Sequence, residues 1–365
     1  MADSVLEEKA ANNQKKEGRT KLIKKVIYSI LLSFIFAITG TVSVQANEML
    51  GGYTIERVPN KHQIDSNLGY FYLFEQAGTQ DRLGVKLVNS SNQAKVLKVK
   101  VTNANTNSNG LLDYTGSLKD HKDLKQPLSS IVKAAQTEVT VPAKSTIETT
   151  LTVSMPKEKF SGVIVGGIVV SEKSNEEKNK QKEEVSIQNT YNYTLGVVLT
   201  NDAKTVMNQH VSVTLDKVAP ILSDGKKIVQ ADILNPNSYI FDKATVSGDI
   251  RKKDSDKVLK KQEKTDVSIA PHSVYPFQFD WGKDELTPGE YLFTGSVKAG
   301  GKEWFFNRVF KITADSAKEI NEQSIYYVVI PLWLRISWIV VLLINIVGTG
   351  YLVIKRVKKI NKEKI

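Results

Sequence analysis

The sequence predicts an all-β protein with two tandem β-sandwiches, held between an N-terminal signal peptide and a C-terminal transmembrane helix. Three observations support this fold class. Apolar and polar residues alternate along most of the chain from residue 53 onward, helical periodicity is nearly absent there, and an apolar stretch next to basic residues stands near each end. With 365 residues, the chain has room for two ordinary domains and accessory segments.

The formal net charge of +11 is concentrated at the two ends. Residues 1–25 hold seven Lys/Arg and four Asp/Glu, and the segment from Lys355 to the end holds six Lys/Arg and one Glu. Both basic segments flank apolar stretches, which is typical of membrane topology and not of phosphate recognition. The sequence therefore predicts no nucleic-acid partner.

Residues 1–46 have the pattern of a signal peptide. Lys24 and Lys25 precede a short apolar run from Val26 to Ile38, and small residues occupy the −3 and −1 positions of a cleavage site after Ala46. The apolar run is short for a hydrocarbon core of about 30 Å. An uncleaved membrane anchor is the alternative.

Residues 326–354 are predicted to form a single transmembrane helix. The segment from Ile336 to Ile354 has 19 residues and no charge, which is long enough to span a bilayer. The basic residues of 355–365 predict a cytoplasmic tail, and Trp333 and Trp338 fit the outer interface. We therefore expect a single-pass protein of the cell membrane, with the bulk of the chain facing the cell wall.

The exported region divides into two β-rich segments. In residues 47–172, Leu83, Val85 and Leu87 alternate with polar or small residues, and the apolar run from Gly162 to Val170 predicts a strand buried on both faces. Residues 173–183 are charged and form a linker or loop. The alternation resumes in 184–315, where 291–297 and 304–312 predict a hairpin. Each segment has the length of an immunoglobulin-like sandwich.

No residue pattern indicates catalysis, a cofactor or a metal. The chain has no cysteine, and its four histidines, His62, His121, His210 and His272, are far apart and have no metal-ligand or triad-like spacing. A nucleophile elbow and a phosphate-binding glycine loop are absent from the sequence. The sequence therefore predicts a protein that is not an enzyme, although a carboxylate pair of the glycosidase type stays an open alternative.

An asparagine-rich stretch is the candidate ligand-binding segment. It contains Asn105, Asn107 and Asn109, and Tyr114 follows it. Side chains of these types can hydrogen-bond and stack against a sugar or a peptide. The alternative is that the asparagines only shape a turn, because asparagine tolerates left-handed backbone geometry.

Several co-linear motifs carry a resemblance to a known family. They are Gln63-Ile64-Asp65, Gly69-Tyr70-Phe71, Thr106 to Gly110 with Asp113-Tyr114, Met155-Pro156, Phe160 to Ile168, Asn235-Pro236, Ala270 to Ser273, Phe277 to Gly282, Pro288 to Tyr291, Trp304, and Phe310 to Thr313. Together they cover residues 50–315, and the chain resembles the WxL-interacting proteins, which are wall-associated proteins of Gram-positive bacteria. Two loops depart from the family pattern. Ala77-Gly78-Thr79 stands where Pro-Gly-Gln is usual, and Asn60-Lys61-His62 stands where a proline is common.

The resemblance implies a non-catalytic scaffold on the cell surface. In that family the first domain is held to bind peptidoglycan and the second to bind secreted WxL-domain proteins, so the implied role is to tether those proteins to the wall. Two other functions stay open from the residues alone: a membrane-anchored glycan hydrolase of the cell wall, and a host-directed adhesin.

Overall fold

A computed structural model describes residues 50–173, 191–326 and 331–362, and within these ranges the chain is mostly β. The predicted signal peptide lies outside the described residues. The chain has two units, residues 1–52 and residues 53–365, and of the first unit only the 3-10 turn η1 (Leu50–Gly52) is described.

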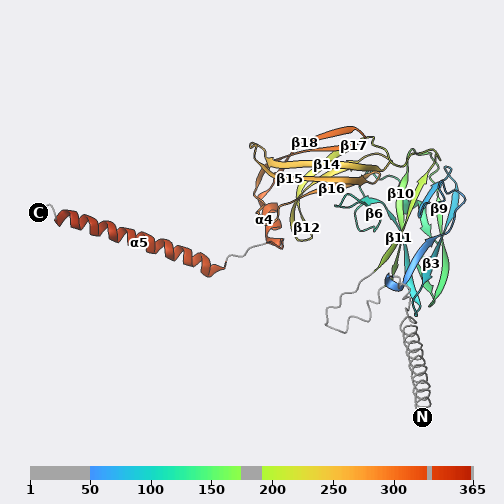
Figure 1. Cartoon of the computed structure of the whole chain (residues 1–365), viewed down its shortest axis with the longest axis horizontal. Coiled ribbons are helices and arrows are strands. Elements are labelled where there is room, and N and C mark those ends of the chain that lie inside the picture. The colour runs from blue at the N-terminus through green and yellow to red at the C-terminus, as the bar shows by residue number, and fades with distance from the viewer. Residues whose placement is uncertain (1–49, 174–190, 327–330, 363–365) are drawn as a thin grey trace, which may run out of the picture. The chain divides into compact units, whose positions relative to one another are not determined.

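The first pair of sheets forms a sandwich, called here the first sandwich. Its four-stranded sheet has the order β1-β3-β9-β7 and its five-stranded sheet the order β2-β11-β10-β4-β8. The strands are β1 (Tyr53–Arg57), β2 (Phe71–Phe74), β3 (Gln80–Asn89), β4 (Lys95–Asn103), β7 (Val132–Ala134), β8 (Glu138–Val141), β9 (Ser145–Ser154), β10 (Ile164–Glu172) and β11 (Asn192–Thr200). The one-turn helix α2 (Leu128–Ile131) precedes β7. Figure 1 shows β3, β9, β10 and β11 lying side by side.

The core of the first sandwich follows the predicted alternation. Leu83, Val85 and Leu87 of β3 are fully buried, and the polar or small residues between them point away from this core. All seven residues from Ile164 to Val170 of β10 are buried, which confirms the prediction that this strand is covered on both faces.

Strand β11 belongs to the first sandwich, although its position in the sequence predicted that it would belong to the second segment. The expected second segment begins at residue 184, but β11 pairs antiparallel with β10 and parallel with β2 of the first sandwich. Its inward side chains, Val197 and Leu199, are fully buried in that core. A period of two shows which side chains share a face and does not show which strand is the neighbour, so the alternation alone did not reveal this.

The second pair of sheets, called here the second sandwich, is formed by the orders β12-β13-β16 and β15-β14-β17-β18. The strands are β12 (Thr214–Ser223), β13 (Lys226–Asn235), β14 (Phe241–Lys252), β15 (Val258–Ile269), β16 (Ser273–Asp280), β17 (Gly289–Ala299) and β18 (Lys302–Ile312). β17 and β18 pair in regular register around Gly300 and Gly301, which confirms the predicted hairpin. Figure 1 shows β14, β15, β17 and β18 lying together.

A helix that the sequence pattern did not predict completes the second sandwich. Helix α4 (Ala314–Gln323) follows β18, and the Thr313 hydroxyl accepts a hydrogen bond from the Ser316 amide at its start. Ala317 and Ile320 of α4 belong to the second core. The folded chain therefore extends beyond the expected boundary at residue 315.

Helix α5 (Leu332–Lys362) is apolar over most of its length. The segment Leu332–Arg356, with a mean hydropathy of 2.1, is the one span in the described chain that is long and apolar enough to cross a membrane. The apolar helix is thus present, although it begins at Leu332, later than the expected residue 326.

A third apolar cluster joins residues of the two sandwiches. Val163, Val165 and Val198 of the first pack with Ile240 and Ala270 of the second. This cluster covers the outer face of the five-stranded sheet, and it explains why β10 is buried on both sides.

Candidate functional site

The asparagine-rich stretch folds into a short hairpin that projects from β4. Strand β5 (Asn105–Thr106) pairs with β6 (Leu112–Asp113), and the turn between them is closed by the side chain of Asn107. The Asn107 Oδ1 accepts hydrogen bonds from the backbone amides of Asn109 and Leu111, at 2.9 and 3.2 Å. We call residues Asn105–Asp113 the asparagine hairpin.

The asparagine hairpin is anchored on the second sandwich. The Thr106 hydroxyl oxygen accepts a hydrogen bond from the Ala270 amide at 3.0 Å and lies 3.2 Å from the Ser273 hydroxyl oxygen. At the tip, the Gly110 carbonyl accepts a hydrogen bond from the Ser268 amide at 2.7 Å. Gly110 has a φ of 75°, and a Cβ there would lie 2.9 Å from Val267, so the close approach requires glycine.

A polar cleft of about 550 Å³ lies on one side of the hairpin. We call it the histidine cleft. It is lined by Asn105, Thr106 and Leu118–Lys122 from the first sandwich and by Asp216, Lys217, Gln230, Asp232, Val274 and Pro276 from the second.

Hydrogen bonds orient the polar groups of the histidine cleft. The Asp120 carboxylate accepts from the side-chain amides of Asn103 and Asn105, at 2.6 and 2.9 Å. Across the cleft, the buried Asp232 accepts from the Gln230 amide at 2.6 Å and pairs with the Lys217 ammonium at 3.4 Å. Fixed carboxylates and amides beside ammonium groups can bind hydroxyls, amides and carboxylates of a ligand.

His121 lines the histidine cleft, and its Nδ1 accepts a hydrogen bond from the Asp123 amide at 3.3 Å. Its ring nitrogens lie 3.6 Å from the Asp123 carboxylate and 4.0 Å from that of Asp216, which are longer than hydrogen bonds. Lys119 and Asp120 beside it are exposed. These side chains therefore keep hydrogen-bonding capacity that a bound ligand can use.

A second, smaller cleft lies at the tip of the hairpin and has a volume of about 300 Å³. Ser108 and Asn109 line it together with residues of β13, β15 and β16, among them Lys264 and Tyr275. Burial raises the pKa of the Tyr275 hydroxyl to about 12, so this group stays neutral and can donate or accept a hydrogen bond.

The four predicted ligand-binding residues do not meet in one place. Asn105 lines the histidine cleft and Asn109 lines the tip cleft. Asn107 closes the turn, as the alternative reading expected. Tyr114 packs over Gly167 of β10, and burial raises the pKa of its hydroxyl to about 12. A ligand-binding role for Asn105 and Asn109 stays a prediction.

Sequence reasoning missed the charged half of the histidine cleft. The run Lys119-Asp120-His121-Lys122-Asp123 is charged and polar, as surface loops commonly are, so its composition did not mark a site. Asp216 and Asp232 lie far away in the sequence, and only the docking of the two sandwiches brings them to the same cleft.

A third cleft, of about 850 Å³, is formed by loops of the first sandwich and Tyr239 of the second. Phe74, Phe160 and Asn201 line it. These residues come from four separate segments, so no sequence pattern indicated the cleft.

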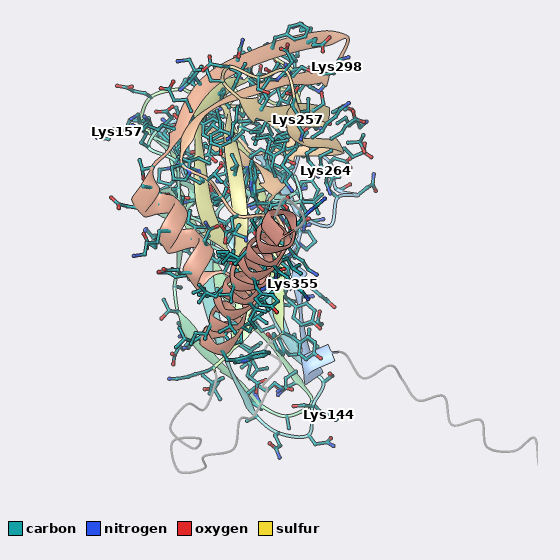
Figure 2. All side chains as sticks on the ribbon, turned by 90° about the vertical axis from the view of Figure 1, so that its left-hand side faces the viewer. Lys144, Lys157, Lys257, Lys264, Lys298 and Lys355 are labelled. Atoms are coloured by element: carbon teal, nitrogen blue, oxygen red, sulfur yellow. The ribbon has the colours of Figure 1, made fainter. Side chains whose placement is uncertain are left out.

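The six lysines labelled in Figure 2 lie on separate parts of the described chain. Lys144 and Lys157 lie at opposite ends of the first sandwich, at the two ends of β9 (Figure 2). Lys257, Lys264 and Lys298 belong to the second sandwich and Lys355 to α5.

Comparisons with solved structures return bacterial chaperones and related domains at low similarity. The YadV chaperone is 12% identical, with a TM-score of 0.26 over 71% of this chain and 100% of that one. The CsuC-CsuE chaperone–tip adhesion subunit complex of Acinetobacter baumannii is 10% identical, with a TM-score of 0.28 over 64% and 92%. The human CEP192 PapD-like domain is 10% identical, with a TM-score of 0.23 over 44% and 92%. Similarity at this level carries no functional argument. A comparison with curated protein sequences returned no match.

Two family models match most of the exported region. Residues 53–172 match the peptidoglycan binding domain of the WxL Interacting Protein, and residues 182–322 match the host binding domain of the WxL Interacting Protein. Both models describe binding domains, and both support a binding role at the cell surface. Because the matches cover well over half of the chain and confirm the resemblance seen in the motifs, the chain belongs to the WxL-interacting protein family.

Proposed function

We propose that this protein is a non-catalytic cell-surface scaffold that binds peptidoglycan and tethers a second protein to the wall of a Gram-positive bacterium. The match of residues 53–172 to a peptidoglycan binding domain carries the first part of the proposal. Helix α5 supports the location, since it would hold the exported region beside the wall.

The histidine cleft is the peptidoglycan site in this proposal. Peptidoglycan presents hydroxyls, amides and peptide carboxylates, and the cleft offers carboxylates, amides and ammonium groups for each of them. Its polar groups are held by hydrogen bonds before a ligand arrives, which lowers the entropic cost of binding. Asn105 is the predicted site residue that takes part through Asp120.

Co-sedimentation of the full chain in detergent with purified peptidoglycan sacculi tests this part. Lys119→Ala and Asp216→Ala each remove one cleft side chain, and we expect each to weaken binding by about three- to tenfold, as for ordinary contact residues. Lys157→Ala removes an exposed lysine at one end of β9 and is the matched control.

The co-sedimentation experiment distinguishes an error about peptidoglycan binding from an error about the location of the site. If the unchanged chain does not pellet with sacculi, peptidoglycan binding is wrong. If it pellets and both cleft variants pellet equally well, binding stands but the histidine cleft is not the site, and the larger cleft around Phe74 and Phe160 becomes the one to test.

The second sandwich is the partner-binding part of the scaffold, and its partner is a secreted WxL-domain protein. Phe305 and Val309 point outward from β18, with 76% and 46% of their surface exposed. Exposed apolar side chains on one sheet face are typical of a protein-binding surface. The family description supports a different partner class, a host ligand, for residues 182–322.

Binding assays with two ligands separate the partner classes. The full chain is tested against a purified WxL-domain protein and against host extracellular-matrix proteins. We expect Phe305→Ser to abolish capture of the WxL-domain protein and Lys257→Ala, at an exposed lysine outside β17 and β18, to leave it unchanged. Capture of matrix proteins without the WxL-domain protein would replace tethering by host adhesion. A chain that cleaves sacculi would instead support the hydrolase alternative.

A further inference from the structure

Three side chains that are distant in sequence meet on the first sandwich, outside every cleft described above. The His62 Nδ1 lies 2.7 Å from Glu75 Oε1 and 3.4 Å from Asp81 Oδ2. His62 is in the loop before β2, Glu75 directly follows β2, and Asp81 is in β3. One donor atom from each of the three lies within 4.8 Å of the other two.

Local hydrogen bonds hold each of these side chains in place. The His62 carbonyl accepts from the Phe74 amide at 3.0 Å, and the Glu75 amide donates to the Thr200 carbonyl at 2.9 Å. The Asn60 side-chain amide donates to Asp81 Oδ2 at 2.7 Å, and the Asn60 Oδ1 accepts from the His62 backbone amide at 2.7 Å. The three donor groups are therefore positioned by the fold.

The cluster carries more negative charge than its surroundings offset. The Glu75 side chain is 1% exposed and that of Asp81 is 15% exposed. Among the described residues, His62 is the one ion-pair partner of both carboxylates. The Glu75 and Asp81 carboxyl groups also hydrogen-bond each other, so a shared proton offsets part of this charge, and a bound cation would replace that proton.

The donor set indicates which cation fits. One imidazole nitrogen and two carboxylate oxygens are ligands of Zn²⁺, which binds four donors at about 2.0–2.2 Å. Tetrahedral ligands at that distance are about 3.3 Å apart. The 3.4 Å between His62 and Asp81 matches this spacing, and the 2.7 Å hydrogen bond between His62 and Glu75 would have to lengthen by about 0.6 Å. Ca²⁺ and Mg²⁺ prefer oxygen donors, whereas an imidazole nitrogen beside carboxylates suits Zn²⁺.

We propose that His62, Glu75 and Asp81 bind one Zn²⁺ ion. The ion ties the loop that carries His62 to β2 and β3 of the first sandwich. The His62 side chain is 34% exposed, so solvent reaches the cluster and water can supply the fourth ligand. This site is separate from the proposed peptidoglycan and partner surfaces. The zinc proposal can therefore be correct or wrong independently of the proposed function.

Zinc binding by the full chain in detergent tests the proposal. After treatment with a chelator, the chain is titrated with ZnCl₂ by calorimetry, and bound zinc is counted by mass spectrometry after desalting. We expect one zinc per chain for the unchanged protein and a loss of at least about tenfold in affinity for His62→Gln and Glu75→Gln. Glu138→Gln changes an exposed carboxylate of β8 and should bind zinc as the unchanged chain does.

The zinc titration also distinguishes a zinc-binding site from a cluster whose three side chains only share protons. If the unchanged chain binds no zinc, or if both variants bind it as well as the unchanged chain does, the proposal is wrong and the three groups share protons only. Should Glu75→Gln fail to fold, Asp81→Asn replaces it, and a rise in the thermal midpoint of the unchanged chain on adding ZnCl₂ supports the site.

Discussion

At the scale of single residues, two buried asparagines organise corresponding corners of the two sandwiches. Asn89 at the end of β3 donates to the carbonyls of Gln93, Val141 and Pro142. Asn235 at the end of β13 is fully buried and donates to those of Tyr239, Ile269 and Ala270. In each case the side-chain oxygen accepts a backbone amide two residues on. One amide thus satisfies several loop carbonyls that would otherwise lack a partner.

We expect Asn235→Ala to lower the free energy of unfolding by about 1–3 kcal/mol, because buried carbonyls lose their donor. Thermal or urea unfolding measures the change. Asn307→Ala on the exposed face of β18 is the control and should change stability by less than about 0.5 kcal/mol. Equal effects of the two substitutions would contradict the role given to Asn235.

Because of His272, we expect the folded chain to lose stability as the pH falls. Burial lowers the pKa of its imidazole, with nearby Asp123 raising it and His121 lowering it to smaller extents, and its Nε2 lies 3.0 Å from the Ser238 hydroxyl. A lowered pKa in the folded chain means that the unfolded chain takes up the proton first. The contribution of His272 is therefore complete above about pH 6.5 and is lost as the pH falls through its folded value.

The measurement compares thermal midpoints of the unchanged chain and His272→Asn between pH 7.5 and pH 5. Asparagine suits this position because His272 has a φ of 52°, which asparagine tolerates. The unchanged chain should lose more stability over this interval than the variant. Parallel pH curves would show that His272 contributes nothing to the acid sensitivity.

At the scale of elements, β10 depends on two adjacent glycines. A Cβ on Gly166 would lie 2.2 Å from the Thr102 carbonyl oxygen and 2.6 Å from Leu128, so neither backbone nor core has room for it. We expect Gly166→Ala to destabilise the chain by about 1–3 kcal/mol, the usual cost of overpacking. Gly301→Ala is a useful contrast, because a Cβ at Gly301 meets nothing within 4 Å, although its φ of 75° still adds strain. Unfolding curves that rank Gly301→Ala as the worse change would contradict this account.

The pairing of β11 indicates which fragment of the chain can fold as the first sandwich. A fragment of residues 53–172 lacks β11 and leaves the edges of β2 and β10 without their partner. A fragment of residues 53–205 retains it. We expect the longer fragment to show cooperative thermal unfolding and the shorter one to aggregate or unfold without a clear transition. Cooperative unfolding of the shorter fragment would instead place β11 functionally with the second segment.

At the scale of the whole molecule, the proposed membrane location depends on α5. Because Leu332–Arg356 is apolar and Lys355 and Arg356 stand at its end, the full chain should stay with the membrane fraction through a high-salt wash. A chain ended after residue 326 should appear in the soluble fraction or the medium. Fractionation and immunoblotting measure the distribution, and a truncated chain that stays with the membrane would require another anchor.

The periodicity of the sequence by itself determined the β-rich architecture, the β17–β18 hairpin and the double burial of β10. These features follow from the local order of apolar and polar residues. It also determined the apolar helix at the C-terminal end. Helix α4 was missed although Thr313 and the spacing of Ala317 and Ile320 were a usable signal.

Only the tertiary structure decided which strands are neighbours and which side chains meet. Alternation indicates which face is buried but does not name the partner strand, so β11 was expected with the second segment. The histidine cleft needs both sandwiches, and the His62, Glu75 and Asp81 cluster needs a loop and two strands. Such sites arise from contacts between residues that are distant in the sequence, and these contacts leave no local pattern for the sequence to show.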